Sequence, residues 1–250
     1  MANDKQSTAT AGLGKTRWIL YREFSSFFGS NLPPLTLGLV AFLCGLVSVV
    51  LALSQGATYE DVTRVIFYFF YIIILAAAIF LSMSSFVSEK RQGTMELLYT
   101  LPVSNLEIVL GKFLMGLVLM TVISIAMTLV YVVGIAEAPW YMAFTGVVGL
   151  IVVGMYAYSV GMFASSITDN YLLALLIGAT IIIVIDIGGF LAGLLPSPSK
   201  EILSHLHGLS QYTPFTRGVI PLKGVVFFTG TGAFFLFLCV KALESRHWRG

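Results

Sequence analysis

Long stretches almost free of charge restrict this chain more than any other feature of its sequence. Six such stretches cover about residues 33–54, 65–88, 108–136, 139–167, 171–195 and 224–240. A helix that crosses a bilayer needs roughly 20 apolar residues. Every stretch except the last exceeds that length, and the last also uses its neighbours Leu222 and Ala242. Because 58% of the residues are hydrophobic and only 10% are charged, a soluble single domain is excluded. The sequence predicts an all-α integral membrane protein with six transmembrane helices.

The residues before the first stretch divide into two parts. Residues 1–14 are small and polar, so we expect a disordered leader. Residues 15–30 mix aromatic and basic side chains, and helical spacing places the apolar ones near one stripe. This pattern is typical of an amphipathic helix in the cytoplasmic interface of a membrane; the alternative is the entry turn of the first span. We expect residues 15–250 to form a single membrane domain.

The distribution of lysine and arginine predicts the orientation in the membrane. With the N-terminus inside, ten of the 14 basic residues fall in cytoplasmic segments. The other four are Arg64, Lys200, Arg217 and Lys223. Because cytoplasmic loops carry an excess of lysine and arginine, we expect both termini in the cytoplasm. Lys112 lies near the cytoplasmic end of the third stretch, where we expect it to snorkel toward the headgroups.

The most charged connection lies between the second and third stretches, at Ser88–Ser104 (SEKRQGTMELLYTLPVS). Gly93 permits a sharp turn there, and Thr94 can cap a following helix that Pro102 ends. The apolar face of that helix consists of Met95, Leu97, Leu98 and Leu101. A short amphipathic helix held at the membrane surface suits docking into a groove of a soluble partner. An ordinary interfacial loop helix is the alternative.

This segment carries the pattern E-K-R-x-G-T-x-E-L-L-x-T-x-P-V-S, which is followed by E-I-V-L-G-K-F-L. The pattern resembles the intracellular signature of ABC-2-type transporter permeases, in particular the group of the gliding-motility protein GldF and the nitrous-oxide-reductase maturation protein NosY. In that family the segment is the cytoplasmic coupling helix, which contacts the ATPase subunit. The resemblance implies ATPase-coupling roles for Glu89, Lys90, Arg91, Gly93, Thr94, Glu96, Leu97, Leu98, Leu101 and Pro102.

The resemblance also implies an activity and a set of partners. The chain would be a permease subunit that couples ATP hydrolysis by a separate cytoplasmic ATPase to export, or to other transmembrane movement, of a substrate. Its partners would be the ATPase subunits, which bind the ATP and Mg²⁺, a second permease chain and the lipids of a bacterial inner membrane. By the resemblance the second permease chain is a second copy of this one in a homodimer, and a related chain in a heterodimer is the alternative. The alternative is a transduction or anchor subunit of an ATPase-driven gliding or periplasmic assembly machine without net transport.

The chain itself lacks the residues of an ATPase. It contains no G-x-x-x-x-G-K-[ST] phosphate loop and no H-E-x-x-H pair. The three histidines and two cysteines are too scattered to indicate a metal site. A net charge of +2 is too small to indicate binding of nucleic acid. We therefore expect a non-catalytic subunit that binds no metal or cofactor of its own.

Other candidate residues lie in the fourth-to-fifth connection and in the fifth stretch. Asp169 and Asn170 form a tight turn, which caps the next helix or adds a second contact with the ATPase. Asp186 is the one acid deep in an apolar stretch, and a functional role is the default expectation for such a residue. Beside it, Gly189 and Gly193 form a G-x-x-x-G pattern for close helix contact. Three uses remain open: helix packing or a dimer contact, a gate residue of a cavity, and proton coupling.

Residues 196–221 form the longest external loop that this topology predicts. Pro196 and Pro198 stop the fifth helix, and residues 200–209 (KEILSHLHGL) are expected to form a short interfacial helix. Arg217 follows shortly before the sixth stretch. It pairs with Asp186 or meets lipid headgroups, and the sequence leaves both alternatives open.

Overall fold

The computed structural model describes residues 58–94, 104–134, 139–192 and 207–247, together with the isolated positions 38, 40, 42 and 45. The predicted leader and the predicted interfacial helix at residues 15–30 lie outside these residues, as does most of the first predicted span. The four isolated positions all belong to that span; among them Val40 is buried in the main hydrophobic core, whereas Phe42 is exposed.

All regular elements in the described ranges are helical. They are α3 (Tyr59–Ser82), α4 (Ser84–Arg91), α6 (Asn105–Gly134), α7 (Trp140–Ile167), α8 (Tyr171–Ala192), α10 (Gly208–Tyr212), the 3-10 helix η1 (Phe215–Arg217) and α11 (Leu222–His247). Four segments in these ranges are long and apolar enough to cross a membrane: Tyr59–Arg91, Asn105–Val133, Trp140–Ile167 and Leu222–Ser245. The all-α membrane class is confirmed, and the count of six spans stays a prediction.

The second predicted span, residues 65–88, is longer in the structure and has a break. The helix begins at Tyr59, because the Thr58 hydroxyl accepts a hydrogen bond from the backbone N–H of Asp61 at 3.3 Å. The break falls at Met83, between α3 and α4. On either side of it, the hydroxyls of Ser82 and Ser84 donate to backbone carbonyls three residues earlier, each at 3.1 Å. Bonds of this kind compete with the helical ladder and bend helices.

The sixth predicted span, residues 224–240, is also longer, since α11 extends from Leu222 to His247. Its last part is polar and continues as helix beyond the apolar stretch. There Lys241 and Glu244 form an ion pair at 2.7 Å, which supports a helix at this spacing. In the return loop, residues 200–206 lie outside the described part, and the helix that is described begins only at Gly208.

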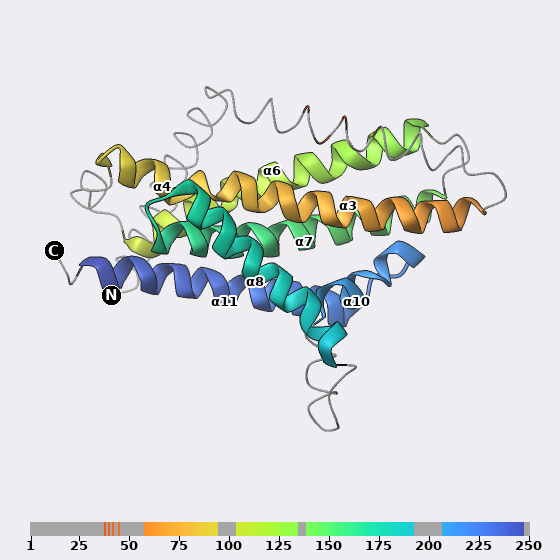
Figure 1. Cartoon of the computed structure of the whole chain (residues 1–250). Helices are drawn as coiled ribbons and strands as arrows, with labels where there is room; N and C mark the ends of the chain where they lie inside the picture. Colours follow the sequence, from red (N-terminus) through yellow and green to blue (C-terminus); the bar gives the residue numbers. More distant parts are fainter. Residues whose placement is uncertain are drawn as a thin grey trace, which may run out of the picture.

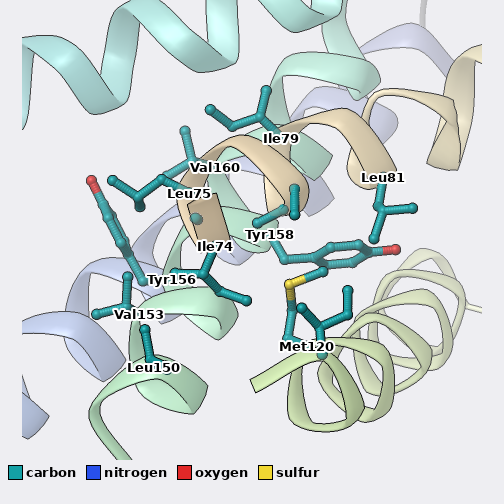
Figure 2. Packing of buried hydrophobic residues seen from close by; sticks show 14 of the residues in the cluster. Ile74, Leu75, Ile79, Leu81, Met120, Leu150, Val153, Tyr156, Tyr158 and Val160 are labelled. Carbon is teal, nitrogen blue, oxygen red and sulfur yellow. The ribbon is translucent and has the colours of Figure 1, made fainter. Parts of the chain in front are cut away.

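α7 occupies the centre of the bundle and contacts α3, α4, α6, α8, α11 and η1. Figure 1 shows α3, α6, α7 and α11 running side by side, with α8 crossing them obliquely. Close packing is possible because α7 presents small residues to its neighbours. Buried examples are Gly146, Gly149, Gly154, Ala157, Gly161 and Ala164. Figure 2 shows Ile74 and Leu75 packing close to Val153 and Tyr156, with Met120 beside the ring of Tyr158.

Gly116 is a glycine of α6 that lies close against α7. A Cβ added there would collide with the ring of Tyr158 on α7, which is itself buried. We expect Gly116→Ala to destabilise the folded chain by about 1–3 kcal/mol, the usual cost of overpacking a core. Gly230→Ala on α11 is the matched control, because nothing lies within 4 Å of a Cβ at that position. Denaturation of both variants in detergent micelles measures the difference, and equal stability would contradict the α6–α7 contact.

Candidate functional site

Two groups of polar residues lie at opposite ends of the described bundle. The first surrounds α4, where α7 ends and α8 begins, at the other end of the bundle from α10 (Figure 1). The second surrounds Asp186, whose backbone carbonyl binds His207 directly before α10. We name them the Lys90 cluster and the Asp186 cluster. The Lys90 cluster comprises Glu89, Lys90, Arg91, Lys112, Ser165, Ser166, Thr168, Asp169 and Tyr171. The Asp186 cluster comprises Tyr71, Asp186, His207, Leu209 and Tyr212.

Lys112 is buried rather than directed to the membrane surface. Its Nζ donates to Oε1 of Glu89 at 2.9 Å, and the two side chains are only 4% and 13% exposed. The same ammonium lies 5.3 Å from the centre of the Phe86 ring, a favourable cation–π distance. The expectation that Lys112 snorkels is therefore wrong. The physical reason is that α4 supplies a carboxylate inside the bundle, so the charge needs no headgroup.

Lys90 caps the C-terminal end of α7. Its Nζ donates to the backbone carbonyls of Ser165, Ser166 and Thr168 at 3.0, 2.7 and 2.9 Å. It also lies 3.5 Å from Oδ1 of Asp169, and its side chain is only 7% exposed. The last carbonyls of a helix have no partner within the helix, and the helix dipole favours a cation beside them. Lys90, which belongs to α4, supplies both the hydrogen-bond donor and the positive charge at this end of α7.

A second set of contacts holds the same two segments together. The backbone N–H of Phe86, in the first turn of α4, donates to Oγ of Ser165 at 3.3 Å. Nε of Arg91 donates to the carbonyl of Asp169 at 3.1 Å, and the guanidinium lies 5.0 Å from the centre of the Tyr171 ring. Each helix end is thus capped by a side chain of the other segment.

The turn between α7 and α8 has the local structure that its residues predict. Oδ1 of Asn170 accepts from the backbone N–H of Leu172 at 3.0 Å, so Asn170 caps α8. Gly93, at the end of α4, has the positive φ of 67° that the predicted turn requires. Thr94 donates through its hydroxyl to the carbonyl of Glu89 at 3.3 Å. The helix that Thr94 was expected to cap lies outside the described residues, with Glu96, Leu97, Leu98, Leu101 and Pro102.

The structure therefore brings together the segment that resembles the coupling helix and the turn for which a second ATPase contact was one of two alternatives. Glu89, Lys90 and Arg91 come from the first, and Asp169 and Asn170 from the second. The residues of α7 that bind the first segment, Ser165 and Ser166, were not predicted from the sequence. The only local signal for them is the polar run that begins at Ser165 and ends an otherwise apolar helix.

In the Asp186 cluster, three helices meet at one carboxylate. The hydroxyl of Tyr71 on α3 donates to Oδ1 and Oδ2 of Asp186 at 2.9 and 3.1 Å. The backbone N–H of Leu209 on α10 donates to the same carboxylate. The ring Nδ1 of His207 donates to the backbone carbonyl of Asp186. Asp186 thereby ties the return segment, residues 207–218, to α3 and α8.

Aromatic packing completes the Asp186 cluster. The rings of Tyr71 and Tyr212 stack with centres 4.9 Å apart, and Tyr212 also stacks on Phe215 at 6.1 Å. Complete burial raises the pKa of Tyr212 well above its usual value, so this phenol stays neutral. The hydroxyl of Thr145 on α7 donates to the carbonyl of Phe215 at 2.8 Å. The return segment is consequently packed into the bundle and forms part of its core.

The other candidate residues of this region, Arg217 and the two glycines of the G-x-x-x-G pattern, are not part of the Asp186 cluster. Arg217 is exposed, and no ion pair joins it to Asp186 in the structure. Gly189 lies within α8, whereas Gly193 lies outside the described residues, so the G-x-x-x-G contact stays a prediction. Among the residues that are described, no three of His, Cys, Asp and Glu gather into a group able to hold a metal ion.

Comparison with known families decides the identity of the chain. A family model described as ABC-2 family transporter protein matches residues 9–230. The chain belongs to this ABC-2 family. A comparison with curated proteins finds no match. ABC-2 permeases are multi-pass membrane components of ABC transporters and normally work with a cytoplasmic ATPase. The match spans both polar clusters, so each lies within the ABC-2 domain.

Proposed function

We propose that this ABC-2 protein is the permease subunit of a bacterial inner-membrane ABC transporter. It couples ATP hydrolysis by a separate cytoplasmic ATPase, which holds the ATP and Mg²⁺, to the export or transmembrane movement of a substrate. The observation that supports this most is the Lys90 cluster, in which the two segments assigned to ATPase contact are bound to each other by Lys90 and Arg91. Because the two turns are joined, movement of the ATPase displaces both of them together.

The orientation follows from the distribution of basic residues. Both termini and the Lys90 cluster face the cytoplasm, where lysine and arginine are in excess. The Asp186 cluster and the return segment, residues 207–218, then face the outside. The docking face consists of Leu97, Leu98 and Leu101, Glu96 is a polar contact that selects the partner, and Gly93 is the hinge. A second permease chain completes the substrate path.

A pull-down of the full chain from its native membrane tests this function. We expect a P-loop ATPase to co-purify in stoichiometric amount, and Glu96→Lys to reduce the bound ATPase about tenfold or more, because charge reversal at an interface repels the partner. Glu244→Lys is the matched control, since Glu244 is an exposed acid on α11 paired only locally with Lys241, and we expect it to bind normally.

Two results would contradict the proposal: no ATPase bound to the wild-type chain, or binding unchanged by both Glu96→Lys and the double change Leu97→Asp with Leu98→Asp. A complex that hydrolyses ATP while nothing crosses the membrane would instead favour the alternative of a transduction or anchor subunit.

A further inference from the structure

Lys90 differs from an ordinary basic residue at a membrane surface. Such residues hold their charged group in water or among headgroups and bury only the stem. The ammonium of Lys90 is instead enclosed by three backbone carbonyls and the carboxylate of Asp169. Hydrogen bonds from a charged donor are shorter and stronger than neutral ones. The ammonium of Lys90 therefore binds groups of its own chain, and little of the side chain is accessible to a partner protein.

The acceptors of Lys90 make this contact a joint between helices. Backbone carbonyls cannot move without the helix that carries them, so a displacement of Lys90 displaces the end of α7. Two further contacts, Phe86 N–H to Ser165 Oγ and Arg91 Nε to the carbonyl of Asp169, lie on either side of it. Several contacts spread along α4 restrict rotation as well as translation of α4 against α7.

α4 is joined to α3 through an interruption of the helix and to α7 through side-chain contacts. The helix is interrupted at Met83, although Met83 keeps a helical backbone conformation and donates its N–H to the carbonyl of Ile79 at 3.0 Å. On either side of it, the Ser82 and Ser84 hydroxyls donate to carbonyls of α3. Breaks of this kind are places where a helix bends. We therefore expect bending at Met83 to take up part of a push on α4, whereas the end of α7 follows Lys90. From α7, contacts lead to α3, α6, α8 and α11.

We propose that Lys90 is a positioning residue that transmits movement of the ATPase-facing segment into α7, so that α4 and the α7–α8 turn move as one body. This inference rests on the proposed function. It differs from the simpler expectation that motion passes along the second and third spans alone. The mechanical role belongs to the ammonium, since the carbonyls at the end of α7 accept hydrogen bonds and offer nothing to an apolar side chain.

Substitution of Lys90 in the purified permease–ATPase complex tests the inference. Lys90→Met keeps the length of the side chain and removes its charge. We expect the ATPase to stay bound while the stimulation of its hydrolysis rate by the permease falls about tenfold, within the usual range of coupling between sites. Lys90→Arg retains a cation and should recover part of the stimulation. Lys241→Met, at a lysine whose side chain is 55% exposed, should change neither quantity.

A distance measurement that keeps Lys90 tests the same point without relying on the fold of a Lys90 variant. Spin labels at Gln92 and Leu173, both exposed, report the position of α4 against α8 after Cys44 and Cys239 are replaced by alanine. We expect the same distance with and without ATP in the labelled complex. A distance that changes with ATP would overturn the inference, because the two segments would then move separately.

The outcomes separate the inference from the function on which it rests. A wild-type chain that binds no ATPase overturns the proposed function, and the inference with it. A bound ATPase that is stimulated equally by wild type and Lys90→Met overturns the inference alone. Loss of stimulation together with an unchanged Gln92–Leu173 distance supports both.

Discussion

Replacement of Lys112 by methionine is expected to destabilise the folded chain by about 3–5 kcal/mol, the usual cost of leaving one member of a buried ion pair behind. Glu89 and Lys112 are 2.9 Å apart and nearly enclosed. Without the ammonium, the Glu89 carboxylate loses its main counter-charge in a part of the bundle where water is scarce. Denaturation of both proteins in detergent micelles measures the difference.

The double variant Glu89→Gln with Lys112→Met is the informative control. It removes both charges, and a neutral pair of similar size is often no less stable than a buried ion pair. We therefore expect most of the lost stability to return in the double variant. A loss of less than about 1 kcal/mol in Lys112→Met, the range of exposed pairs, would mean that Lys112 reaches the headgroups after all.

Replacement of Asp186 by alanine is expected to destabilise the chain by about 3 kcal/mol, since it leaves two donors without an acceptor, one on the buried Tyr71 and one on the half-buried Leu209, and a loss of this kind costs about 1–3 kcal/mol for each buried group. The donors are the Tyr71 hydroxyl and the Leu209 N–H. The loss should be greatest in the return segment, which this carboxylate ties to α3 and α8. Denaturation in micelles gives the size of the effect, and limited proteolysis at residues 207–218 gives its place.

Tyr71→Phe supplies the second arm of a double-mutant cycle. It removes one donor and keeps the aromatic stack on Tyr212. If the hydrogen bond exists, the combined variant should lose less stability than the sum of the two single variants. Strictly additive losses would show that Tyr71 and Asp186 act independently. Asp186→Asn, which keeps one acceptor oxygen, should fall between wild type and Asp186→Ala.

The effect of replacing Asp186 also bears on the three roles that the sequence leaves open for it: helix packing or a dimer contact, a gate residue of a cavity, and proton coupling. A carboxylate that accepts from Tyr71 and Leu209 has a packing role within the chain. The same contacts would have to break if the return segment moved during transport. A stabilising role and a gate role are therefore compatible, and only transport measured on the Asp186→Asn variant distinguishes them.

The sequence alone was sufficient for features that depend on neighbouring residues. The length of the apolar stretches predicts the membrane helices, and α7 and α8 begin within one residue of the expected positions. The local chemistry of Gly93 and Asn170 predicts a turn and a cap, and both have the required geometry. The spacing of residues in Ser88–Ser104 resembles the ABC-2 pattern, and the match over residues 9–230 bears out that family.

Helix ends were predicted less well, because apolar length is only one of the forces that set them. α3 starts six residues before Val65, where Thr58 provides a cap and Glu60 and Asp61 favour the first turn. α11 continues past Val240 because a helix in water keeps its hydrogen bonds when polar pairs such as Lys241 and Glu244 lie along it.

The partners of the buried charges were decided only by the tertiary structure. Lys90 binds carbonyls 75 to 78 positions away, and Tyr71 reaches Asp186 over 115 positions. The hydropathy of a sequence shows that a charge is present in or beside an apolar stretch, but it does not show which group will lie opposite that charge. Which group pairs with each buried charge depends on which helices pack together and on how each helix is rotated about its own axis. Small residues such as those of α7 permit these close contacts, but side-chain packing over the whole bundle selects among them.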